Sequence, residues 1–295
     1  MTVKTVAIVA IALVAGAVMF PGCITQEEAE SANMPIVLFT DFGTESYWVP
    51  HLKGIIYSVN SDARVIDGTH EITAFDIREG AFLLYLAAKD FPADVVFIGN
   101  VAHPREGRYI VLTTDKGQIS VGPDNGLFTY IIRNFEVKSV YRISNQSLFT
   151  KPPNSLFASQ IIGTIGGLIA SGFAPKDVGP AVDDPYTVDA HEASIVERKI
   201  VGEVVLIDHF GNCITNIPRN MTEEFGLRFG DEVIIVTHDA EIAAMVGTRY
   251  QDVPEGNPVI FVNRLDLAEI AINMGHFANT HNIRTGTIIE IEIKA

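Results

Sequence analysis

The feature that most constrains the fold of this chain is a regular alternation, over residues 35–143, between short apolar runs and stretches with helical spacing. The runs are rich in β-branched and aromatic residues, as in IVLFT at 36–40, which is typical of strands buried in a parallel sheet. Strands joined by helices favour an α/β architecture with both faces of the sheet covered. The expected strands are 36–40, 64–66, 95–99, 108–114, 118–122 and 137–143, and the expected helices are 51–59, 77–89, 127–134 and 156–171.

The pattern changes after residue 171. Residues 172–198 are rich in Pro, Asp and Gly, and we interpret them as a linker between 35–171 and 199–295. Beyond the linker, short strands with few helices predict a small barrel or sandwich. These strands are expected at 202–208, 214–217, 232–237, 258–262 and 285–293.

The first 34 residues have the composition of a targeting signal and a tether. An apolar run of about 15 residues at 6–20 is shorter than the roughly 20 that a spanning helix needs, but it suits a signal segment. Gly22-Cys23 then resembles a lipoprotein signal in which Cys23 becomes the lipidated N-terminus, so 1–23 is the expected signal and 24–34 an acidic tether. The alternative is an uncleaved anchor helix. Both interpretations predict an extracytoplasmic, membrane-anchored protein.

The charge excludes some functions. A formal net charge of −15 repels phosphate backbones, so nucleic-acid binding is not expected. Cys23 and Cys213 do not form a disulfide framework or a metal knuckle, and the histidines lack the spacing of a metal site, so no metal is expected.

Polar residues directly after two expected strands are candidates for chemistry, because ligands of open α/β sheets bind beyond the carboxyl ends of strands. Asp41 follows 36–40 and could grip vicinal ribose hydroxyls, or it could cap the next helix. His103, in NVAHPREGR after 95–99, could be a catalytic or binding group, or only a polar strand end.

Two turns carry further candidates. In DHFGNCITNI, Asp208 and Asn212 stand on a turn and could meet an ammonium group and a heterocycle edge, or form a plain hairpin turn. In GPDNGLFT, Asp124 and Asn125 are ordinary turn and cap residues.

Taken together and in order, TDFG, THEI–FDIREGAFLL, GPDNGLFT, IDHFGNCITNI and LAEIAINMG resemble the S-adenosylmethionine hydroxide adenosyltransferase family, the hydrolases related to fluorinating and chlorinating enzymes. The resemblance covers residues 36–294. It implies an α/β N-terminal domain with a central, mainly parallel sheet, a small C-terminal β-barrel domain and a homotrimer. It also implies that S-adenosylmethionine, as substrate or ligand and without another cofactor, lies between one subunit's N-terminal domain and its neighbour's C-terminal domain. Water or a halide would attack the ribose 5′ carbon.

The resemblance also implies which residues bind this molecule. Asp41 would hold the ribose diol, Asp208 would lie near the methionine ammonium group, and Asn212 would meet the adenine edge. Phe75 matches an aromatic residue near the ribose, and the backbone of the segment with Asn273 and Met274 would meet adenine. The substrate-binding set is therefore Asp41, Phe75, Asp208, Asn212, Asn273 and Met274.

The water-handling positions depart from the family pattern. His103 stands where the hydrolases have an aspartate, Arg105 or Arg108 would replace their arginine, and Phe157 stands where a histidine is usual. Three functions follow as hypotheses. The first is a divergent hydrolase in which His103, with Arg105 or Arg108, handles water, since a neutral imidazole can accept a proton. The second is an extracytoplasmic adenosine- or S-adenosylmethionine-binding lipoprotein without catalysis. The third is adenosyl transfer to another nucleophile, such as halide.

Overall fold

The computed structural model describes residues 33–150 and 157–294. The predicted signal segment 1–23 and the predicted tether up to residue 32 lie outside the described residues. Within the described ranges, no helix combines the length and the apolar character needed to cross a membrane.

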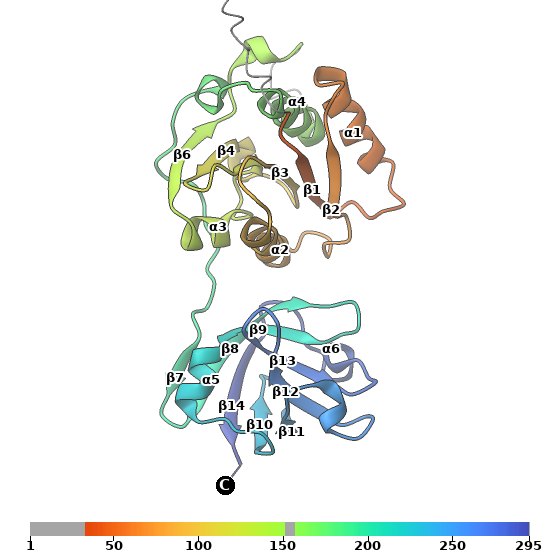
Figure 1. Ribbon diagram of the computed structural model, residues 1–295, viewed down its shortest axis with the longest axis vertical. Coiled ribbons are helices and arrows are strands. Elements are labelled where there is room, and N and C mark those ends of the chain that lie inside the picture. Colours follow the sequence, from red (N-terminus) through yellow and green to blue (C-terminus); the bar gives the residue numbers. More distant parts are fainter. Residues whose placement is uncertain (1–32, 151–156, 295) are drawn as a thin grey trace, which may run out of the picture. The chain divides into compact units, whose positions relative to one another are not determined.

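The first part of the described chain is built on a six-stranded sheet with the order β2-β1-β3-β5-β4-β6 (Figure 1). Neighbours among β2, β1, β3 and β5 run parallel, whereas β4 is antiparallel to both β5 and β6, so the predicted mainly parallel sheet is confirmed. Strands β4 and β5 pair with each other as an antiparallel hairpin. The strands are β1 (Ile36–Thr40), β2 (Val65–Thr69), β3 (Val96–Asn100), β4 (Tyr109–Thr114), β5 (Ile119–Pro123) and β6 (Val137–Arg142).

Helices cover both faces of this sheet. Side chains alternate between the two faces along each strand, so one strand contributes residues to the cores on both sides. Ile36 and Leu38 of β1 pack in one core with residues of α1 and α4, whereas Val37 and Phe39 pack in a second core with residues of α2 and α3. The helices are α1 (Trp48–Val59), α2 (Ile77–Asp90), α3 (Thr129–Asn134) and α4 (Ala158–Ala170). Helix α1 begins at Trp48 rather than at the predicted residue 51, because a proline such as Pro50 is tolerated in the first helical turn.

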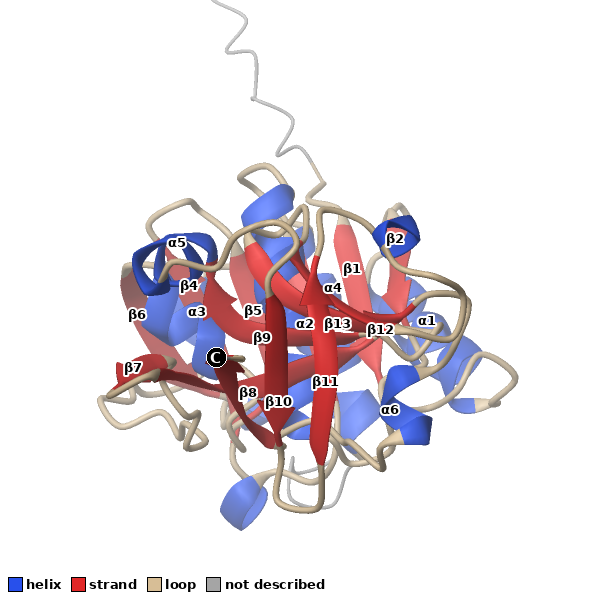
Figure 2. Cartoon of the chain, turned by 90° about the horizontal axis from the view of Figure 1, so that it is seen from below, coloured by secondary structure: helices blue, strands red, loops and turns tan. Residues whose placement is uncertain are grey.

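The C-terminal part is a closed β-barrel. Strands follow one another in the order β14-β10-β11-β12-β13-β9-β8, and a further pairing of β14 with β8 closes the ring. β7 (Ser194–Val196) adds to β8, and the short helices are α5 (Arg219–Phe225) and α6 (Phe277–Thr280), which Figure 2 shows in blue among the red strands. The barrel strands are β8 (Lys199–Ile207), β9 (Cys213–Pro218), β10 (Glu232–Val236), β11 (Glu241–Val246), β12 (Pro258–Val262), β13 (Leu267–Ile272) and β14 (Ile288–Ile293).

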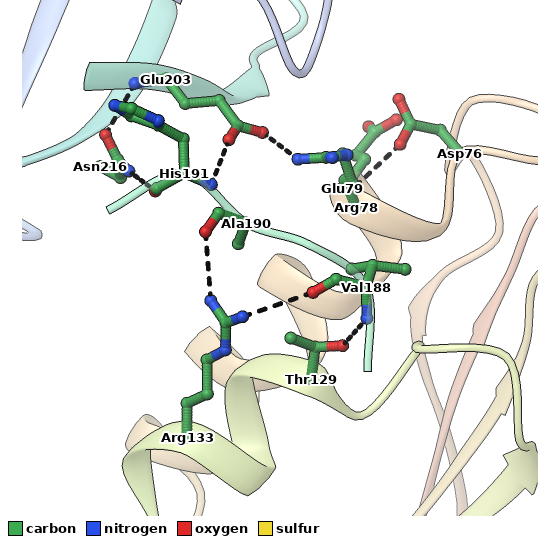
Figure 3. A network of polar contacts seen from close by, with 10 residues as sticks. All are labelled: Asp76, Arg78, Glu79, Thr129, Arg133, Val188, Ala190, His191, Glu203 and Asn216. Carbon is green, nitrogen blue, oxygen red and sulfur yellow. Dashed lines mark hydrogen bonds and ion pairs between the residues drawn. The ribbon is translucent and has the colours of Figure 1, made fainter. Parts of the chain in front are cut away.

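A buried carboxylate links helix α2 to strand β8 (Figure 3). Glu203 on β8 forms an ion pair with Arg78 of α2 and accepts a hydrogen bond of 2.8 Å from the backbone N–H of His191. Asn216 donates to the carbonyl of His191 at 2.5 Å, so the same short segment is held from two sides. A charge this deeply buried is costly unless it is paired, and here both carboxylate oxygens are used.

Candidate functional site

The Asp41 carboxylate organises the carboxyl edge of the sheet. Asp41 directly follows β1, and its Oδ2 accepts backbone hydrogen bonds from Phe75 at 3.0 Å and from Ala102 at 3.2 Å. Both donors have left-handed backbone conformations, with φ of 66° for Phe75 and 56° for Ala102. Such conformations cost energy in residues other than glycine and occur preferentially at functional sites. Asp41 does not cap the following helix, since α1 begins only at Trp48.

Phe75 is presented on a rigid turn. Its ring is 70% exposed, and the next residue, Asp76, caps α2 by accepting from the N–H of Glu79 at 3.0 Å. Glu79 in turn accepts from the N–H of Thr73 at 2.9 Å, so the turn is held at both ends. Burial raises the pKa of Glu79. An aromatic ring exposed beside a carboxylate is well placed to meet a ligand that the carboxylate binds.

His103 lies beside this arrangement. It follows Ala102, whose N–H contacts Asp41, and its own carbonyl accepts from the amide of Asn125 at 3.1 Å. Asn125 is buried and also donates to the carbonyl of Val101 at 2.9 Å, so this turn residue fixes the loop after β3. The imidazole of His103 is exposed and makes no hydrogen bond among the described residues. It is therefore free to contact a ligand or water.

The two candidate arginines differ in their surroundings. Arg108 forms ion pairs with Asp124 and with Asp184 (3.2 Å), and it donates to the carbonyl of Asp184 at 2.9 Å. Arg105 is exposed and lies over the ring of Tyr186, 4.6 Å from its centroid. The charge of Arg108 is thus engaged in holding the segment around Asp184, whereas the guanidinium of Arg105 is not paired with a carboxylate in the described part of the chain.

An aromatic cluster lies where α1 and α4 begin. Trp48 is 5.9 Å from Tyr47, 5.5 Å from His51 and 6.5 Å from Phe157, measured between ring centroids. Phe157, which the family resemblance predicted at the position of a histidine, is largely exposed. Its ring supplies no proton acceptor at this position.

A second polar group occupies one turn of the barrel. Asp208 accepts through Oδ1 from the N–H groups of Phe210 and Asn212, both at 2.9 Å, and through Oδ2 from the amide of Asn212 at 2.8 Å. The amide of Asn212 also lies 3.4 Å from the hydroxyl of Tyr250, which donates to Glu269 at 2.7 Å. Burial and the hydrogen bond to Glu269 raise the pKa of Tyr250, so its proton stays on the hydroxyl at neutral pH.

The segment after β13 contains two of the predicted residues, Asn273 and Met274, and their side chains have different surroundings. Asn273 is buried, and its amide donates to the carbonyl of Val253 at 2.7 Å. Met274 follows with a left-handed φ of 57° and a side chain that is 84% exposed. The amide of Asn273 therefore stabilises the turn that presents Met274.

The structure thus brings the predicted residues together in two groups. Asp41, Phe75 and His103 lie at the carboxyl edge of the sheet and form the carboxyl-edge group. Asp208 and Asn212 lie on one turn of the barrel and form the barrel-turn group. No hydrogen bond joins the two groups in the ranges 33–150 and 157–294. Sequence reasoning missed Ala102, Tyr250 and Glu269 as members of these groups, and it treated Asn125 only as a turn residue. No cluster of three metal-ligating side chains occurs in the same ranges.

Residues 36–179 match the SAM hydroxide adenosyltransferase N-terminal domain, and residues 202–290 match the C-terminal domain of the same family. The chain belongs to the SAM hydroxide adenosyltransferase family. The matched domains contain the carboxyl-edge group and the barrel-turn group respectively, so both groups lie on the family's own framework.

Several known proteins are similar to the chain over most of its length. The (R)-S-adenosyl-L-methionine hydrolase of Methanocaldococcus jannaschii is 29% identical, over 88% of this chain and 95% of the relative. The fluorinase of Actinopolyspora mzabensis is 25% identical, over 89% of this chain and 99% of the relative. The crystal structure of an uncharacterized conserved protein from Thermotoga maritima superposes with a TM-score of 0.80 at 30% identity, over 87% of this chain and 99% of that chain.

Proposed function

We propose that this protein transfers the adenosyl group of S-adenosylmethionine to water, giving adenosine and L-methionine. The observation that carries the proposal is the Asp41 carboxylate. One of its oxygens is held by the N–H groups of Phe75 and Ala102, which fixes the direction of the other. A carboxylate fixed in this way can accept hydrogen bonds from two neighbouring ribose hydroxyls, and charge-assisted bonds of this kind are the stronger ones.

In the proposed reaction, the oxygen of water attacks the 5′ carbon of the ribose. The bond between that carbon and the sulfonium sulfur breaks, and its electrons neutralise the sulfur of the departing methionine. The leaving group is already good, so the protein's main task is to orient the substrate and the water. We assign the proton that water loses to His103, because its imidazole is exposed next to Ala102 and has no partner among the described residues.

The barrel-turn group is proposed to bind the rest of the molecule. Asp208 carries the charge that suits the methionine ammonium group, and Asn212 offers an amide to the adenine edge. Since no hydrogen bond in the described chain joins this group to Asp41, we propose that a second copy of the chain supplies it, in a homotrimer. The predicted lipid-modified or uncleaved N-terminal segment would anchor this assembly outside the cytoplasm.

Binding without turnover is the second candidate. It is favoured by the pairing of Arg108 with Asp124 and Asp184, and by the apolar ring of Phe157 where the family has a histidine. In this case the carboxyl edge would bind adenosine or S-adenosylmethionine but would not orient water.

The test is incubation of the full-length protein with S-adenosylmethionine in water enriched in oxygen-18, with adenosine and methionine followed by chromatography and mass spectrometry. Hydrolysis at the 5′ carbon places the heavy oxygen in adenosine. We expect Asp41→Asn to weaken binding by about 10- to 100-fold, equivalent to roughly 1.4–2.8 kcal/mol. We expect His103→Ala to lower turnover by about 100-fold while binding is kept, in the range of general-base effects.

The exposed barrel histidine provides the control, since His238→Ala should change neither quantity. If calorimetry shows binding of S-adenosylmethionine but no adenosine is formed, the proposed hydrolysis would be wrong and the binding function would be supported. No binding of S-adenosylmethionine or adenosine would overturn both candidates.

A further inference from the structure

Thr40, the residue before Asp41, begins a chain of four polar side chains. The hydroxyl of Thr40 lies 2.8 Å from Nδ1 of His70, and Nε2 of His70 lies 2.9 Å from the carboxylate of Asp67. Lys53 of α1 completes the chain with a 2.7 Å ion pair to Asp67. Thr40 and His70 are both fully buried or nearly so, and neither belongs to the groups described above.

The hydrogen-bond pattern is satisfied by the tautomer of His70 that carries a proton on Nε2 and none on Nδ1. Burial raises the pKa of Asp67, but the hydrogen bonds from Lys53 and His70 outweigh this, so its pKa is lowered and the carboxylate is ionised at neutral pH. An ionised carboxylate accepts the Nε2–H of the ring, which leaves Nδ1 as an acceptor for the Thr40 hydroxyl. The Thr40 oxygen can then accept from the N–H of Phe42 at 3.4 Å. The direction of every bond in the chain is therefore set.

The same segment also holds the turn on the far side of Asp41. The carbonyl of His70 accepts from the N–H of Gly43 at 2.7 Å, and Glu71 accepts from the N–H of Thr44 at 2.6 Å. Thr40 is thus tied to the His70 ring before Asp41, and Gly43 is tied to the His70 backbone after it. Asp41 lies between these two fixed points.

We infer that His70, oriented by Asp67, is a positioning residue that acts through Thr40 to fix the Asp41 carboxylate in the geometry that selects a vicinal diol. The inference rests on the proposed function in that Asp41 binds the ribose. The ring of His70 contacts Thr40 and Asp67 rather than Asp41, so its effect on the Asp41 carboxylate passes through Thr40. Its effect is on the preference for a ribose with both hydroxyls over one that lacks a hydroxyl.

The measurement is the ratio of the dissociation constants of 2′-deoxyadenosine and adenosine for the full-length protein, obtained by calorimetry. We expect the wild-type protein to favour adenosine, and Asp41→Asn to bring the ratio close to one. Thr40→Val removes only the hydroxyl and should lower the ratio by about 10-fold, equivalent to about 1.4 kcal/mol. Thr40→Ser keeps the hydroxyl and should keep the ratio, and His238→Ala is the control outside both groups.

A double variant separates positioning from a merely structural role. Thr40→Val or His70→Phe alone leaves one buried polar group without its partner, which lowers stability, whereas replacing both partners by apolar groups is often nearly neutral. The double variant should therefore regain melting temperature relative to the single variants and still show the lowered ratio. If His70→Phe does not fold, Asp67→Asn can be tested instead, because the Asp67 carboxylate is half-exposed. The ratio of dissociation constants should also fall in this variant.

Three results would overturn the inference, and they are distinguishable from one another. A wild-type ratio close to one would show that Asp41 does not read the diol, so the proposed binding mode and this inference would fail together. A high wild-type ratio that is unchanged in folded Thr40→Val and Asp67→Asn variants would overturn only the role of His70. A ratio that recovers together with melting temperature in the double variant would assign the chain to stability alone.

Discussion

At the scale of single residues, the site around Asp41 depends on backbone conformation as well as on side-chain identity. Phe75 and Ala102 both adopt left-handed conformations, and both donate to the same oxygen of Asp41. The carboxylate offsets the cost of these conformations by accepting two N–H groups that point at it. This arrangement explains why a bulky aromatic residue, normally unfavourable at positive φ, is stable there.

Gly211 illustrates the same dependence on backbone conformation in the barrel turn. Its φ is 83°, and a Cβ atom would lie 1.9 Å from Nδ1 of His276. At Gly226, φ is 87° but no atom lies within 4 Å of such a Cβ. We expect Gly226→Ala to cost about 1 kcal/mol of stability, the price of a left-handed conformation alone. Gly211→Ala should cost roughly 3 kcal/mol, because a steric clash is added.

Denaturant unfolding of the two glycine variants measures this difference. Equal midpoints for Gly211→Ala and Gly226→Ala would contradict the packing of the turn against His276. The Gly211 variant should also bind adenosine more weakly, since Asp208 and Asn212 stand on the turn that is displaced.

Functional side chains at strand ends could be predicted from the sequence, but the contacts that hold them in place could not. Asp41 and His103 could be singled out because each follows an apolar run at the carboxyl end of a parallel strand. Ala102 could not, because its role depends on a φ angle and a backbone N–H. Arg105 and Arg108 could not be distinguished either, since the pairing of Arg108 with Asp184 joins residues far apart in the chain.

At the scale of elements, the start of α2 couples a helix cap to a buried carboxyl group. Burial raises the pKa of Glu79 above its ordinary value of 4.5. The folded state therefore holds the proton more tightly than the unfolded state. The resulting contribution to stability is fully present below about pH 4.5 and is lost as the pH rises through the folded-state pKa.

Replacing Glu79 by glutamine tests this coupling. Glutamine keeps an oxygen for the N–H of Thr73 but does not titrate, so Glu79→Gln should flatten the fall in stability above pH 4.5 and raise stability at pH 7 relative to wild type. The measurement is the free energy of unfolding from pH 4 to 8. Glu224→Gln, on the exposed face of α5, is the matched control and should leave the pH dependence unchanged. An unaltered profile in Glu79→Gln would contradict the burial effect.

Element prediction succeeded where local pattern and tertiary pairing agree. Strands β1 and β3 are mostly apolar runs that are buried along their whole length, and the hairpin β4–β5 has a clear turn sequence. Strands β11 and β13 were missed because EIAAMV and LAEIAI contain residues that favour helices. In the barrel they are held by neighbours on both sides, β10 and β12 for β11, β12 and β9 for β13, and this pairing overrides local propensity.

At the scale of the whole molecule, the order of motifs predicted both parts of the fold through the family resemblance that it carries. In the described residues, no hydrogen bond joins the Asp41 group to the Asp208 group. Asp41 is bound to the loops after β2 and β3, whereas Asp208 is bound to Asn212 within the barrel. We propose that a ligand contacted by both carboxylates is bound between copies of the chain, in a closed ring with head-to-tail contacts.

Mixing two inactive variants tests this arrangement. Asp41→Asn and Asp208→Asn each remove one half of the proposed site, so each homo-oligomer should lose turnover, or binding if the protein does not catalyse. An intact site needs one wild-type half from each of two neighbours, and every mixed trimer contains one such pair among its three sites. Purified mixed trimers should therefore show about one third of the wild-type sites. Co-expression with two different affinity tags, followed by sequential purification, isolates the mixed oligomers, and calorimetry with adenosine counts their sites. Mixed oligomers with no restored sites would place both carboxylates in one copy or in separate sites, and a monomer on gel filtration would exclude the shared site altogether.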